Sequence, residues 1–374
     1  MDTALVQLTD RIAQASANKQ ALRIRGGGTK DFLGNTPHGE LLDTTGLRGI
    51  VSYEPTELVV TARAGTPLAE LEAVLAERRQ CLAFEPPHFS YRPGTATVGG
   101  MVAAGLSGPA RASVGAVRDY VLGVKLLNGR GEHLVFGGQV MKNVAGYDVS
   151  RLMAGSMGVL GVITEVSLKV LPMAPAEATL VFELDQAEAL AQLHRWGAQP
   201  LPLNASCWVL DADKSLLFVR LRGAVAAVAS AVTRMTRDAV GHQMDNAQAM
   251  PDWQACRDHR LPIFVTASDA APDLWRLSLP QTAPVLDLPW AQLVEWHGAQ
   301  RWLRAPAAAG AGLRELVARY GGSATLFVAA QADDPHAQSR FSPLAPALKL
   351  IHQRLQAEFD PAGIFDADRL LAEF

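Results

Sequence analysis

The sequence has little cysteine, few aromatic residues and no surplus of charge of either sign. Its three cysteines, Cys81, Cys207 and Cys256, lie far apart. This number and spacing exclude a disulfide framework, and an iron–sulfur cluster would need about four clustered thiolates. We therefore expect no metal site in the chain. The thiols are expected to fill core positions as small hydrophobic groups, which suits a reducing compartment.

The chain also lacks a basic excess and a long hydrophobic run. Its 34 Lys and Arg against 37 Asp and Glu give a net charge of −3, which argues against binding to nucleic acid. The longest uncharged stretch, Pro93 to Ala110, is rich in Gly, Pro, Ser and Thr and reads as a loop entering a helix. The N-terminus carries Asp2, Asp10 and Arg11 among its apolar residues and indicates an amphipathic helix rather than a signal peptide. We expect a cytoplasmic protein.

What is present is an apolar fraction of 49 % with only 6 % aromatics, so Ala, Val and Leu must build the core. A chain of 374 residues predicts two domains. The composition changes at "KVLPMAPAEATL", residues 169–180. We predict a first domain over residues 1–175, completed by the C-terminal segment 341–374, and a second domain over residues 176–340.

The first half alternates short β-rich runs with glycine-rich turns. "ALRIR", "ELVVTARAG" and "GVITEVSLKVL" predict strands, the last with alternate residues on one face. "TPLAELEAVLAER" predicts a helix with Thr66 as its N-cap and Pro67 in the first helical position. Alternation on both sides of Asn128-Gly129 predicts a hairpin.

The second half predicts a β-α-β-β-α-β module from about residue 179 to 240 and beyond, an order found in ferredoxin-like folds. Further β segments are expected near residues 274–279, 293–303 and 324–329. An amphipathic helix over residues 344–359 should end at Pro361 and Gly363.

Three glycine-rich loops lie in the first half: "RGGGT" at 25–29, "RPGTATVGGMVAAGLSG" at 92–108 and "AGSMGVLGVITE" at 154–165. Successive glycines let backbone N–H groups converge on an anion, and a dinucleotide is the natural ligand. The loops match neither a Walker A motif, because Lys30 follows Thr29, nor G-x-G-x-x-G, because residue 31 is not glycine. Any one of these loops taken alone is equally well explained as a turn.

The order and the sequences of these loops resemble the FAD-binding domain of the vanillyl-alcohol oxidase or PCMH type. The resemblance also includes the segments "GAVRDYVLGVKLLNGRGE", "KNVAGYDVSRLMAGSMGVLGVITEVSLKVLP" and the closing "FDPAGIFDADRL". The resemblance covers residues 21–171. It implies an α+β fold, a PCMH-type FAD-binding domain with an α+β cap domain that meets substrate or a partner. Covalent members carry a His beside the first loop, where this chain has Thr29 and Lys30, so the resemblance implies non-covalent FAD.

The resemblance also assigns cofactor-binding residues. The pyrophosphate loop corresponds to Arg25, Gly26, Gly27, Gly28, Thr29 and Lys30, and the second loop corresponds to Pro93, Gly94, Thr95, Thr97, Val98, Gly99, Gly100, Ser107 and Gly108. The segment near the adenine and ribose corresponds to Gly158, Gly161, Val162 and Ile163. The "KNVAGYD" segment near the flavin corresponds to Asn143, Gly146 and Tyr147, and the C-terminal basic residue is Arg369.

As to function, the resemblance implies an FAD-binding subunit of a complex that oxidises glycolate or a similar 2-hydroxy acid to the 2-oxo acid. Its partners would be a larger homologous FAD-binding catalytic subunit and an iron–sulfur subunit, with membrane contact only through the complex. The chain lacks the family's His-x-Gly-Asp-Gly-x-x-His stretch, and "FDADRL" keeps only a basic residue of the usual ending. The alternative is therefore a non-catalytic electron-relay or scaffold subunit. A self-sufficient oxidase that reacts with oxygen is a third reading.

Oxidation of a 2-hydroxy acid needs a base for the hydroxyl and a cation, usually Arg, for the carboxylate. After residue 176, a His lies beside a well-placed Arg at His259-Arg260 and at His297 with Arg301. These four are the catalytic candidates, and ordinary surface residues are the competing interpretation. The tryptophans Trp253, Trp296 and Trp302 could line a flavin-facing pocket, lie in the core or form a subunit interface, and we favour the interface.

Overall fold

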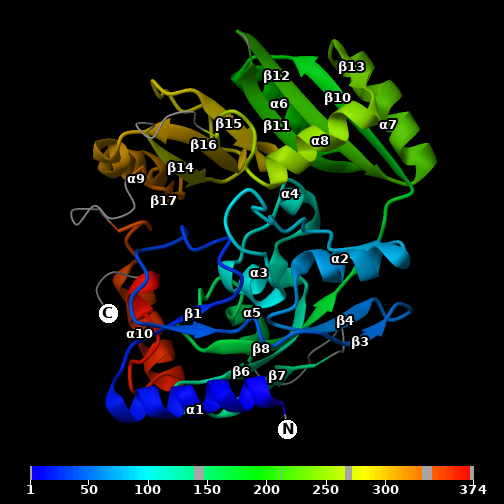
Figure 1. Ribbon diagram of the computed structural model, residues 1–374. Coiled ribbons are helices and arrows are strands. Elements are labelled where there is room, and N and C mark those ends of the chain that lie inside the picture. Colours follow the sequence, from blue (N-terminus) through cyan, green and yellow to red (C-terminus); the bar gives the residue numbers. More distant parts are fainter. Residues whose placement is uncertain (1, 139–146, 212, 266–271, 331–338, 371–374) are drawn as a thin grey trace. The chain divides into compact units, whose positions relative to one another are not determined.

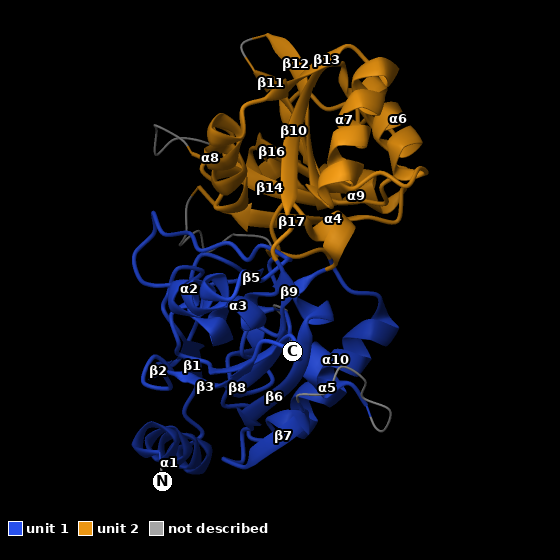
Figure 2. Cartoon of the chain, turned by 90° about the vertical axis from the view of Figure 1, so that its right-hand side faces the viewer, with its two compact units in different colours: residues 1–106, 116–172, 343–374 blue, residues 107–115, 173–342 orange. Residues whose placement is uncertain are grey.

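A computed structural model describes residues 2–138, 147–211, 213–265, 272–330 and 339–370. The chain divides into two compact units, which Figure 2 colours separately. Unit 1 comprises residues 1–106, 116–172 and 343–374, and unit 2 comprises residues 107–115 and 173–342. The changes at 172/173 and 342/343 lie close to the boundaries expected at 175/176 and 340/341.

Unit 1 has a five-stranded antiparallel sheet in the order β3-β4-β8-β6-β7 and two small two-stranded sheets, β1-β2 and β5-β9. Its elements are α1 (Thr3–Asn18), α2 (Leu68–Glu77), α3 (Val98–Ala104), α5 (Val149–Leu152), α10 (Pro346–Phe359), η1 (Val117–Asp119), η4 (Ala367–Arg369), β1 (Leu22–Arg25), β2 (Glu40–Asp43), β3 (Ile50–Glu54), β4 (Val59–Arg63), β5 (Gln80–Cys81), β6 (Val121–Leu127), β7 (His133–Gly137), β8 (Val162–Lys169) and β9 (Leu171–Pro172) (Figure 1).

Strand β8 lies in the centre of the five-stranded sheet, between β4 and β6. The sequence predicted a strand here with one apolar face. Six of its eight residues are buried, on both faces, because a central strand is covered from both sides. Ile163, Val166 and Leu168 belong to the main core of unit 1, which also includes Val98 and Met101 of α3.

The expected hairpin is confirmed, since β6 pairs antiparallel with β7. Its loop is longer than a two-residue turn: the Asn128 Oδ1 accepts hydrogen bonds from the backbone N–H of Arg130 (3.0 Å) and of Glu132 (2.9 Å). The capping prediction for α2 was wrong. The helix begins at Leu68, and the Thr66 hydroxyl instead accepts from Gly49 N (2.9 Å) and donates to Gly49 O (3.1 Å).

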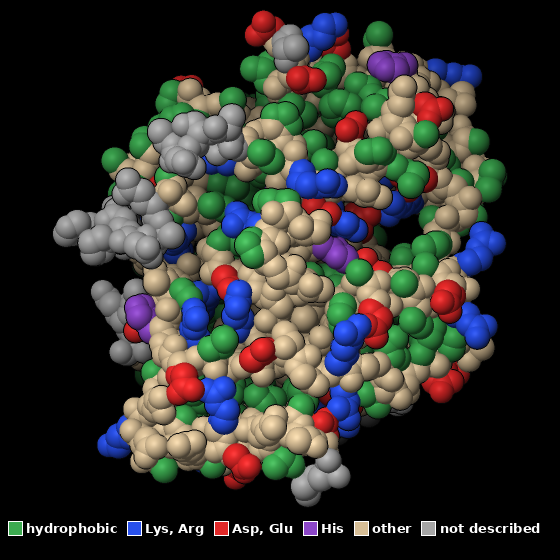
Figure 3. Space-filling model, viewed as in Figure 1, with side chains coloured by type: hydrophobic (Ala, Val, Ile, Leu, Met, Phe, Trp, Pro, Cys, Tyr) green, Lys and Arg blue, Asp and Glu red, His purple; other side chains and the backbone are tan. Residues whose placement is uncertain are grey.

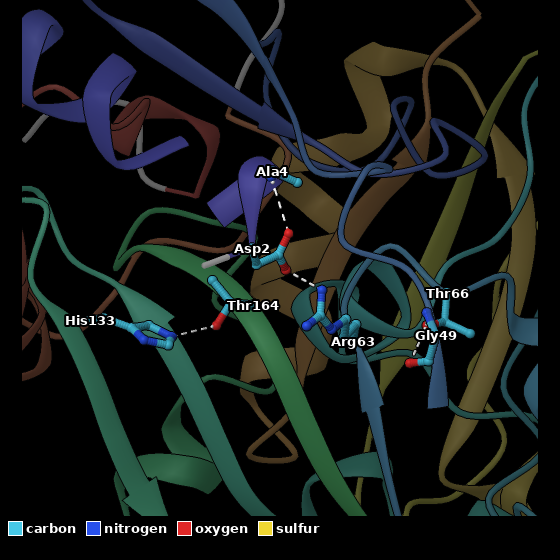
Figure 4. A network of polar contacts seen from close by, with 7 residues as sticks. All are labelled: Asp2, Ala4, Gly49, Arg63, Thr66, His133 and Thr164. Atoms are coloured by element: carbon cyan, nitrogen blue, oxygen red, sulfur yellow. Dashed lines mark hydrogen bonds and ion pairs between the residues drawn. The ribbon is translucent and has the colours of Figure 1, made fainter. Parts of the chain in front are cut away.

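A polar network near the N-terminus joins separate elements of unit 1 (Figure 4). The Asp2 carboxylate caps α1 by accepting from Ala4 N at 3.1 Å, and it also forms an ion pair with Arg63 of β4. His133 of β7 contacts the Thr164 hydroxyl of β8 at 3.0 Å. Burial lowers the pKa of His133, which favours the neutral ring in this contact. These contacts link the start of α1 to β4, and β7 to β8.

The C-terminal segment after α10 returns to β1. Leu22 N donates to Ile364 O over 2.7 Å, and Leu22 forms a parallel bridge with Phe365. The Asp360 carboxylate accepts from the N–H groups of Ile364 (3.1 Å) and Phe365 (2.7 Å) and so shapes the turn. Unit 1 is therefore completed by residues from both ends of the sequence.

Unit 2 is built on one eight-stranded antiparallel sheet in the order β13-β10-β12-β11-β15-β16-β14-β17. Its elements are α4 (Arg111–Val114), α6 (Gln186–Gly197), α7 (Val225–Asp238), α8 (Asn246–Arg257), α9 (Gly310–Ala318), η2 (Trp296–Gly298), η3 (Ala307–Ala309), β10 (Ala176–Glu183), β11 (Leu203–Asp211), β12 (Lys214–Gly223), β13 (Gly241–Met244), β14 (Asp273–Ser278), β15 (Gln292–Glu295), β16 (Gln300–Ala305) and β17 (Ser323–Val328).

The order β10-α6-β11-β12-α7-β13 confirms the predicted β-α-β-β-α-β module. Helices α6 and α7 pack on one face of its strands through a shared apolar cluster that includes Trp196 and Met235, and α8 covers the opposite face (Figure 2). The β segment expected near residues 293–303 is two strands, β15 and β16, joined by η2. The preference for a subunit interface at Trp253, Trp296 and Trp302 was wrong, because all three are buried within unit 2.

Residues 107–115 leave the first half of the sequence and join unit 2. The indole N–H of Trp296 donates to Gly108 O at 3.0 Å, and the Arg111 guanidinium lies 4.5 Å from the centre of the Trp296 ring. These contacts attach α4 to η2. None of the helices in the described ranges is long and apolar enough to cross a membrane.

Candidate cofactor site

The first two glycine-rich loops of unit 1 interlock. Thr95 N donates to Gly27 O over 3.0 Å. A Cβ on Gly27 would lie 1.5 Å from Thr95 O, and a Cβ on Gly94 would lie 1.8 Å from Gly27 O. Any side chain at either position would collide with backbone atoms, so this approach requires glycine at both.

The first loop then turns sharply at Gly28, whose φ of +80° lies in the left-handed region. Its neighbour Gly26 faces Thr97, since an added Cβ would come within 2.5 Å of the Thr97 hydroxyl oxygen. Thr29, which ends the turn, is buried. The loop thereby exposes backbone rather than side chains on its open side, as an anion-binding loop must.

The second loop leads into α3. Thr97 is the N-cap of this helix, and its hydroxyl oxygen accepts from Gly100 N at 3.3 Å. Gly99 packs against Ala64, where an added Cβ would lie 2.6 Å from the alanine methyl. The small residues of the helix therefore let α3 approach β4 closely.

The third loop packs on α3 and β1. Gly155 N donates to Val102 O and Met157 N donates to Ala103 O, both over 2.9 Å. Gly158 has a φ of +87°, and an added Cβ there would contact the Ile24 side chain at 3.3 Å. The three loops, far apart in the sequence, thus form one continuous surface in unit 1.

These loops enclose a cavity of about 130 Å³. Glycine, alanine and threonine make up most of its wall, and charged side chains from β1, the first loop and the C-terminal segment complete it. The lining residues are Arg23, Ile24, Arg25, Gly26, Gly27, Gly28, Thr29, Lys30, Asp31, Leu33, Pro37, Thr44, Ala64, Thr97, Gly99, Gly100, Ala103, Ala104, Met157, Gly158, Gly161, Ile163, Asp366 and Arg369.

The structure places the sequence-predicted cofactor residues in several groups. Those that line the cavity are Arg25, Gly26, Gly27, Gly28, Thr29, Lys30, Thr97, Gly99, Gly100, Gly158, Gly161, Ile163 and Arg369. Pro93, Gly94, Thr95, Val98 and Val162 belong to the same loops or to the elements that follow them, outside the lining. Ser107 and Gly108 lie in unit 2. Tyr147 is 96 % exposed, while Asn143 and Gly146 fall outside the described residues.

Sequence reasoning missed several lining residues. Ala64, Ala103 and Ala104 carry a signal in retrospect, because small residues beside a glycine-rich helix start permit close packing. Asp366 lies three residues before Arg369 in the motif that had already been recognised. Its carboxylate accepts from His38 N at 2.7 Å, and burial raises its pKa.

The charged groups of the cavity suit a phosphate-bearing ligand. Arg25 pairs with Asp31 at 2.6 Å, and Lys30 Nζ lies 5.5 Å from the centre of the Phe89 ring. Arg369 donates to Asn35 O (3.1 Å) and Asp31 O (2.8 Å), which fixes the C-terminal segment against the first loop. Backbone donors exposed by glycines, with cations beside them, fit the pyrophosphate of FAD.

The cavity is smaller than the roughly 300 Å³ at the low end of small-molecule sites, so it accounts for part of a dinucleotide only. Over the face drawn in Figure 3, cationic and anionic side chains are interspersed, consistent with a local anion site rather than a broad basic surface. Among the described residues, no group of three or more His, Cys, Asp or Glu side chains is arranged to hold a metal ion.

The catalytic candidates all lie in unit 2, in different settings. His259 packs among rings, with Phe264 stacked at 4.4 Å and Trp302 and Phe327 at 4.7 and 5.2 Å between ring centres. Arg260, the next residue, is exposed. The candidates thus divide between an aromatic cluster, the surface and the buried region around η2.

Arg301 is fully buried, and its guanidinium is bound to the backbone. Nη1 donates to Pro284 O (2.7 Å), Nη2 to Ala283 O (2.8 Å) and Nε to Gly298 O (3.5 Å). Burial lowers its pKa to about 10. These bonds give Arg301 a structural task in holding the loop before β15, and its contact with a substrate stays a prediction.

His297 occupies a strained, polar position in η2, with φ of +56°. Its Nδ1 lies 3.0 Å from the Ser206 hydroxyl, which also accepts from His297 N, and its Nε2 lies 3.1 Å from the Ser113 hydroxyl. Burial lowers its pKa to about 4, so the ring is neutral at pH 7. A ring that is neutral at pH 7 because its pKa is low is a weak base, and both of its nitrogens contact hydroxyls, so a role for His297 as a proton acceptor stays a prediction.

Comparison with known proteins agrees with this geometry. A family model described as "FAD binding domain" matches residues 5–137. Solved structures of alkyldihydroxyacetonephosphate synthase superpose with TM-scores of 0.63 and 0.64 at 13 % identity, covering 96 % of this chain and 74 % of theirs. That likeness shows the fold. The family match and the fold together place the chain among proteins with a PCMH-type FAD-binding domain.

The sequence relatives are more specific. The chain is 43 % identical to glycolate oxidase subunit GlcE of Escherichia coli (strain K12), over 98 % of this chain and 97 % of the relative. It is 29 % identical to D-2-hydroxyglutarate dehydrogenase of Xanthomonas citri pv. viticola, over 70 % of this chain and 56 % of that protein. Glycolate oxidase subunit GlcD of Bacillus subtilis is 30 % identical over 49 % of this chain and 40 % of its own length. The chain belongs to the GlcE family of FAD-binding glycolate oxidase subunits.

Proposed function

We propose that this chain is the FAD-binding subunit of a glycolate-oxidising complex, in which glycolate or a similar 2-hydroxy acid becomes the 2-oxo acid and electrons pass through FAD to an iron–sulfur partner. The observation that carries the proposal is the 43 % identity to GlcE over nearly the full length of both chains. The cavity between the three glycine-rich loops of unit 1 supports it, because these loops have the features that hold a dinucleotide pyrophosphate.

In this proposal the cavity residues of the first loop, Thr97, Gly99 and Arg369 hold FAD without a covalent bond. When bound, FAD would accept the hydride equivalent from the substrate carbon. The chain's own contribution is to orient the acid and to take the hydroxyl proton. Of the four catalytic candidates, we take His297 as the proton acceptor because its ring is neutral at pH 7 and is positioned by Ser113 and Ser206, although its low pKa makes it a weak base.

The partners are part of the same proposal. The names of GlcE and GlcD describe subunits, which supports a multi-subunit assembly. Transfer of single electrons beyond FAD requires clusters that three dispersed cysteines cannot ligate, so an iron–sulfur subunit must supply them. A larger homologous flavin subunit completes the complex, and any contact with a membrane is made through these partners.

A second candidate, a relay or scaffold subunit without turnover of its own, is favoured by the side chains of two catalytic candidates. Arg301 is bound to three backbone carbonyls, and His259 is enclosed by aromatic rings. If the substrate chemistry lies wholly in a homologous partner, neither side chain needs to be accessible.

The test is to purify the chain alone and load it with FAD. Glycolate or D-lactate is then added without oxygen while the absorbance of the flavin band at about 450 nm is recorded. Bleaching supports a hydride-transfer site in this subunit. A yellow protein that stays yellow supports the relay or scaffold reading. Failure to bind FAD at all would contradict the assignment of the cavity between the glycine-rich loops as the FAD site.

A further inference from the structure

Arg276 in β14 differs from the other arginines of the unit 2 sheet. Its Nε is buried and, among the described residues, has no hydrogen-bond partner. Its guanidinium lies 5.5 Å from the centre of the Phe327 ring, and its strand neighbours are Trp302 of β16 and Thr325 of β17. A buried cationic donor in this condition raises the free energy of the folded protein.

Two arginines of the same sheet show the usual arrangement. Arg301 donates to three carbonyl oxygens, as described above. Arg304 likewise donates to Ile263 O, Phe264 O and Pro272 O, each at 2.8 Å. Backbone carbonyl groups thus satisfy the guanidinium groups of Arg301 and Arg304, whereas the described residues supply no acceptor for the Nε of Arg276.

A second cation increases the cost at Arg276. Arg111 of α4, which stacks on Trp296, is close enough to repel it. Burial first and this repulsion second lower the pKa of Arg276 to about 10. Glu295, a buried carboxylate of the same sheet, is already bound by Cys256 Sγ (3.1 Å), Gln300 Nε2 (3.1 Å) and Trp302 Nε1 (2.7 Å). An anion from outside the chain would accept a hydrogen bond from the Nε of Arg276 and would offset the repulsion between Arg276 and Arg111.

We propose that Arg276, with Arg111 beside it, binds the carboxylate of the 2-hydroxy acid. This inference rests on the proposed function. A guanidinium offers two parallel N–H donors that match a carboxylate, and the neighbouring positive charge strengthens the attraction. An alcohol without a carboxylate would leave the buried Nε of Arg276 without a hydrogen-bond acceptor and would bind more weakly.

The position of Arg111 connects the carboxylate site to the proton acceptor. Ser113, two residues further along α4, contacts the Nε2 of His297. One short helix, attached to η2 through Trp296 and Gly108, therefore carries a residue of each group. The acid and its hydroxyl would meet residues positioned by the same segment.

The experiment uses the full chain loaded with FAD and titrates it with oxalate, a small carboxylate that has no C–H bond to oxidise. Calorimetry should show oxalate binding to the unaltered protein and binding at least about tenfold weaker for Arg276→Gln, the equivalent of losing one charge-assisted bond. Arg319→Gln, on the exposed face of α9, is the matched control and should bind oxalate normally. Ethylene glycol, which lacks a carboxylate, should bind to none of them.

Thermal unfolding gives a second readout. Arg276→Gln should have a melting temperature at or above that of the unaltered protein, because it removes a partly buried cation whose Nε has no acceptor among the described residues. Oxalate should raise the melting temperature of the unaltered protein and not that of the variant. Should Arg276→Gln fail to fold, Arg276→Lys and Arg111→Gln provide the same comparison, with weaker oxalate binding expected in each.

Equal oxalate affinity in the unaltered protein and the Arg276 variants would overturn the inference, and so would an absence of oxalate binding to the unaltered protein. The proposed function fails separately. If oxalate binds through Arg276 but glycolate does not bleach the flavin, the carboxylate site stands and turnover by this subunit does not. If glycolate bleaches the flavin with the same KM in Arg276→Gln, the reaction stands and the assignment of Arg276 does not.

Discussion

The backbone N–H of Thr95 donates to the carbonyl oxygen of Gly27 over 3.0 Å, and this single bond joins the first glycine loop to the second. The two loops lie so close together there that neither has room for a Cβ, at Gly27 in the first or at Gly94 in the second. The wall of the cofactor cavity is thus a contact between two backbones. Substitutions at this contact should affect the cofactor before they affect the rest of the fold.

Gly27→Ala should weaken FAD binding by about 100-fold or more. The added methyl group would lie 1.5 Å from Thr95 O, and a backbone atom cannot move aside as a flexible side chain can. Strain of roughly 3 kcal/mol is a reasonable expectation for such a collision, and about 1.4 kcal/mol corresponds to each factor of ten. Titration of the FAD-free protein with FAD, followed by flavin fluorescence, measures the change.

The matched control is Gly312→Ala, in the first turn of α9, where an added Cβ meets nothing within 4 Å. This change should leave FAD affinity unaltered and stabilise unit 2 by up to about 1 kcal/mol, because alanine favours a helix. Equal FAD affinity in Gly27→Ala and Gly312→Ala would show that the first loop does not carry the cofactor.

Thr97→Val should both destabilise α3 and weaken FAD binding. The substitution keeps the shape of the side chain but removes the oxygen that accepts from Gly100 N and that lines the cavity. Loss of an N-cap costs about 1 kcal/mol. Thr97→Ser keeps the oxygen and should retain most of the stability and affinity. Urea unfolding and FAD titration of the two variants separate the hydroxyl from the methyl group, and identical behaviour would exclude a role for the cap.

Arg369→Gln should lower FAD affinity about tenfold and should lower the melting temperature by a few degrees. Its guanidinium holds Asn35 O and Asp31 O, so its loss frees the C-terminal segment from the first loop. A hydrogen bond to a charged group contributes about 1.5–3 kcal/mol, and partial exposure places these bonds at the low end. Arg354→Gln, on the exposed side of α10, is the control. A large fall in melting temperature with unchanged FAD affinity would make Arg369 purely structural.

Much of the cofactor site could be predicted because its signal is local. Glycine occurs at residues 26–28, 94 and 99–100 because a neighbouring backbone or side chain leaves too little room there for a Cβ. The alternation of strands and helices in unit 2 was equally readable, since hydrophobic periodicity is a property of each segment. The recognised C-terminal motif correctly led to Arg369 at the cavity.

The distinction between Arg276 and Arg301 could not be predicted. Both stand in strands with similar neighbours in the sequence, and what separates them is the presence of carbonyl groups from residues 283, 284 and 298 beside one guanidinium only. The transfer of residues 107–115 to unit 2 depends likewise on the contact of Gly108 with Trp296, which are 188 residues apart. Such pairings arise from tertiary structure and leave no local pattern.

His297 should make the protein less stable as the pH falls from about 6.5 toward 4. Burial lowers its folded pKa from 6.5 to about 4, so the unfolded chain takes up a proton in a range where the folded protein does not. The contribution is fully present above the unfolded pKa and decreases by about 2 kcal/mol by pH 5. His297→Asn, chosen because Asn tolerates a positive φ, should lose this dependence, whereas His242→Gln on the exposed edge strand β13 should keep it. Urea unfolding at pH 7 and pH 5 measures the difference. An unchanged pH dependence in His297→Asn would show that the His297 ring is solvated and free to protonate.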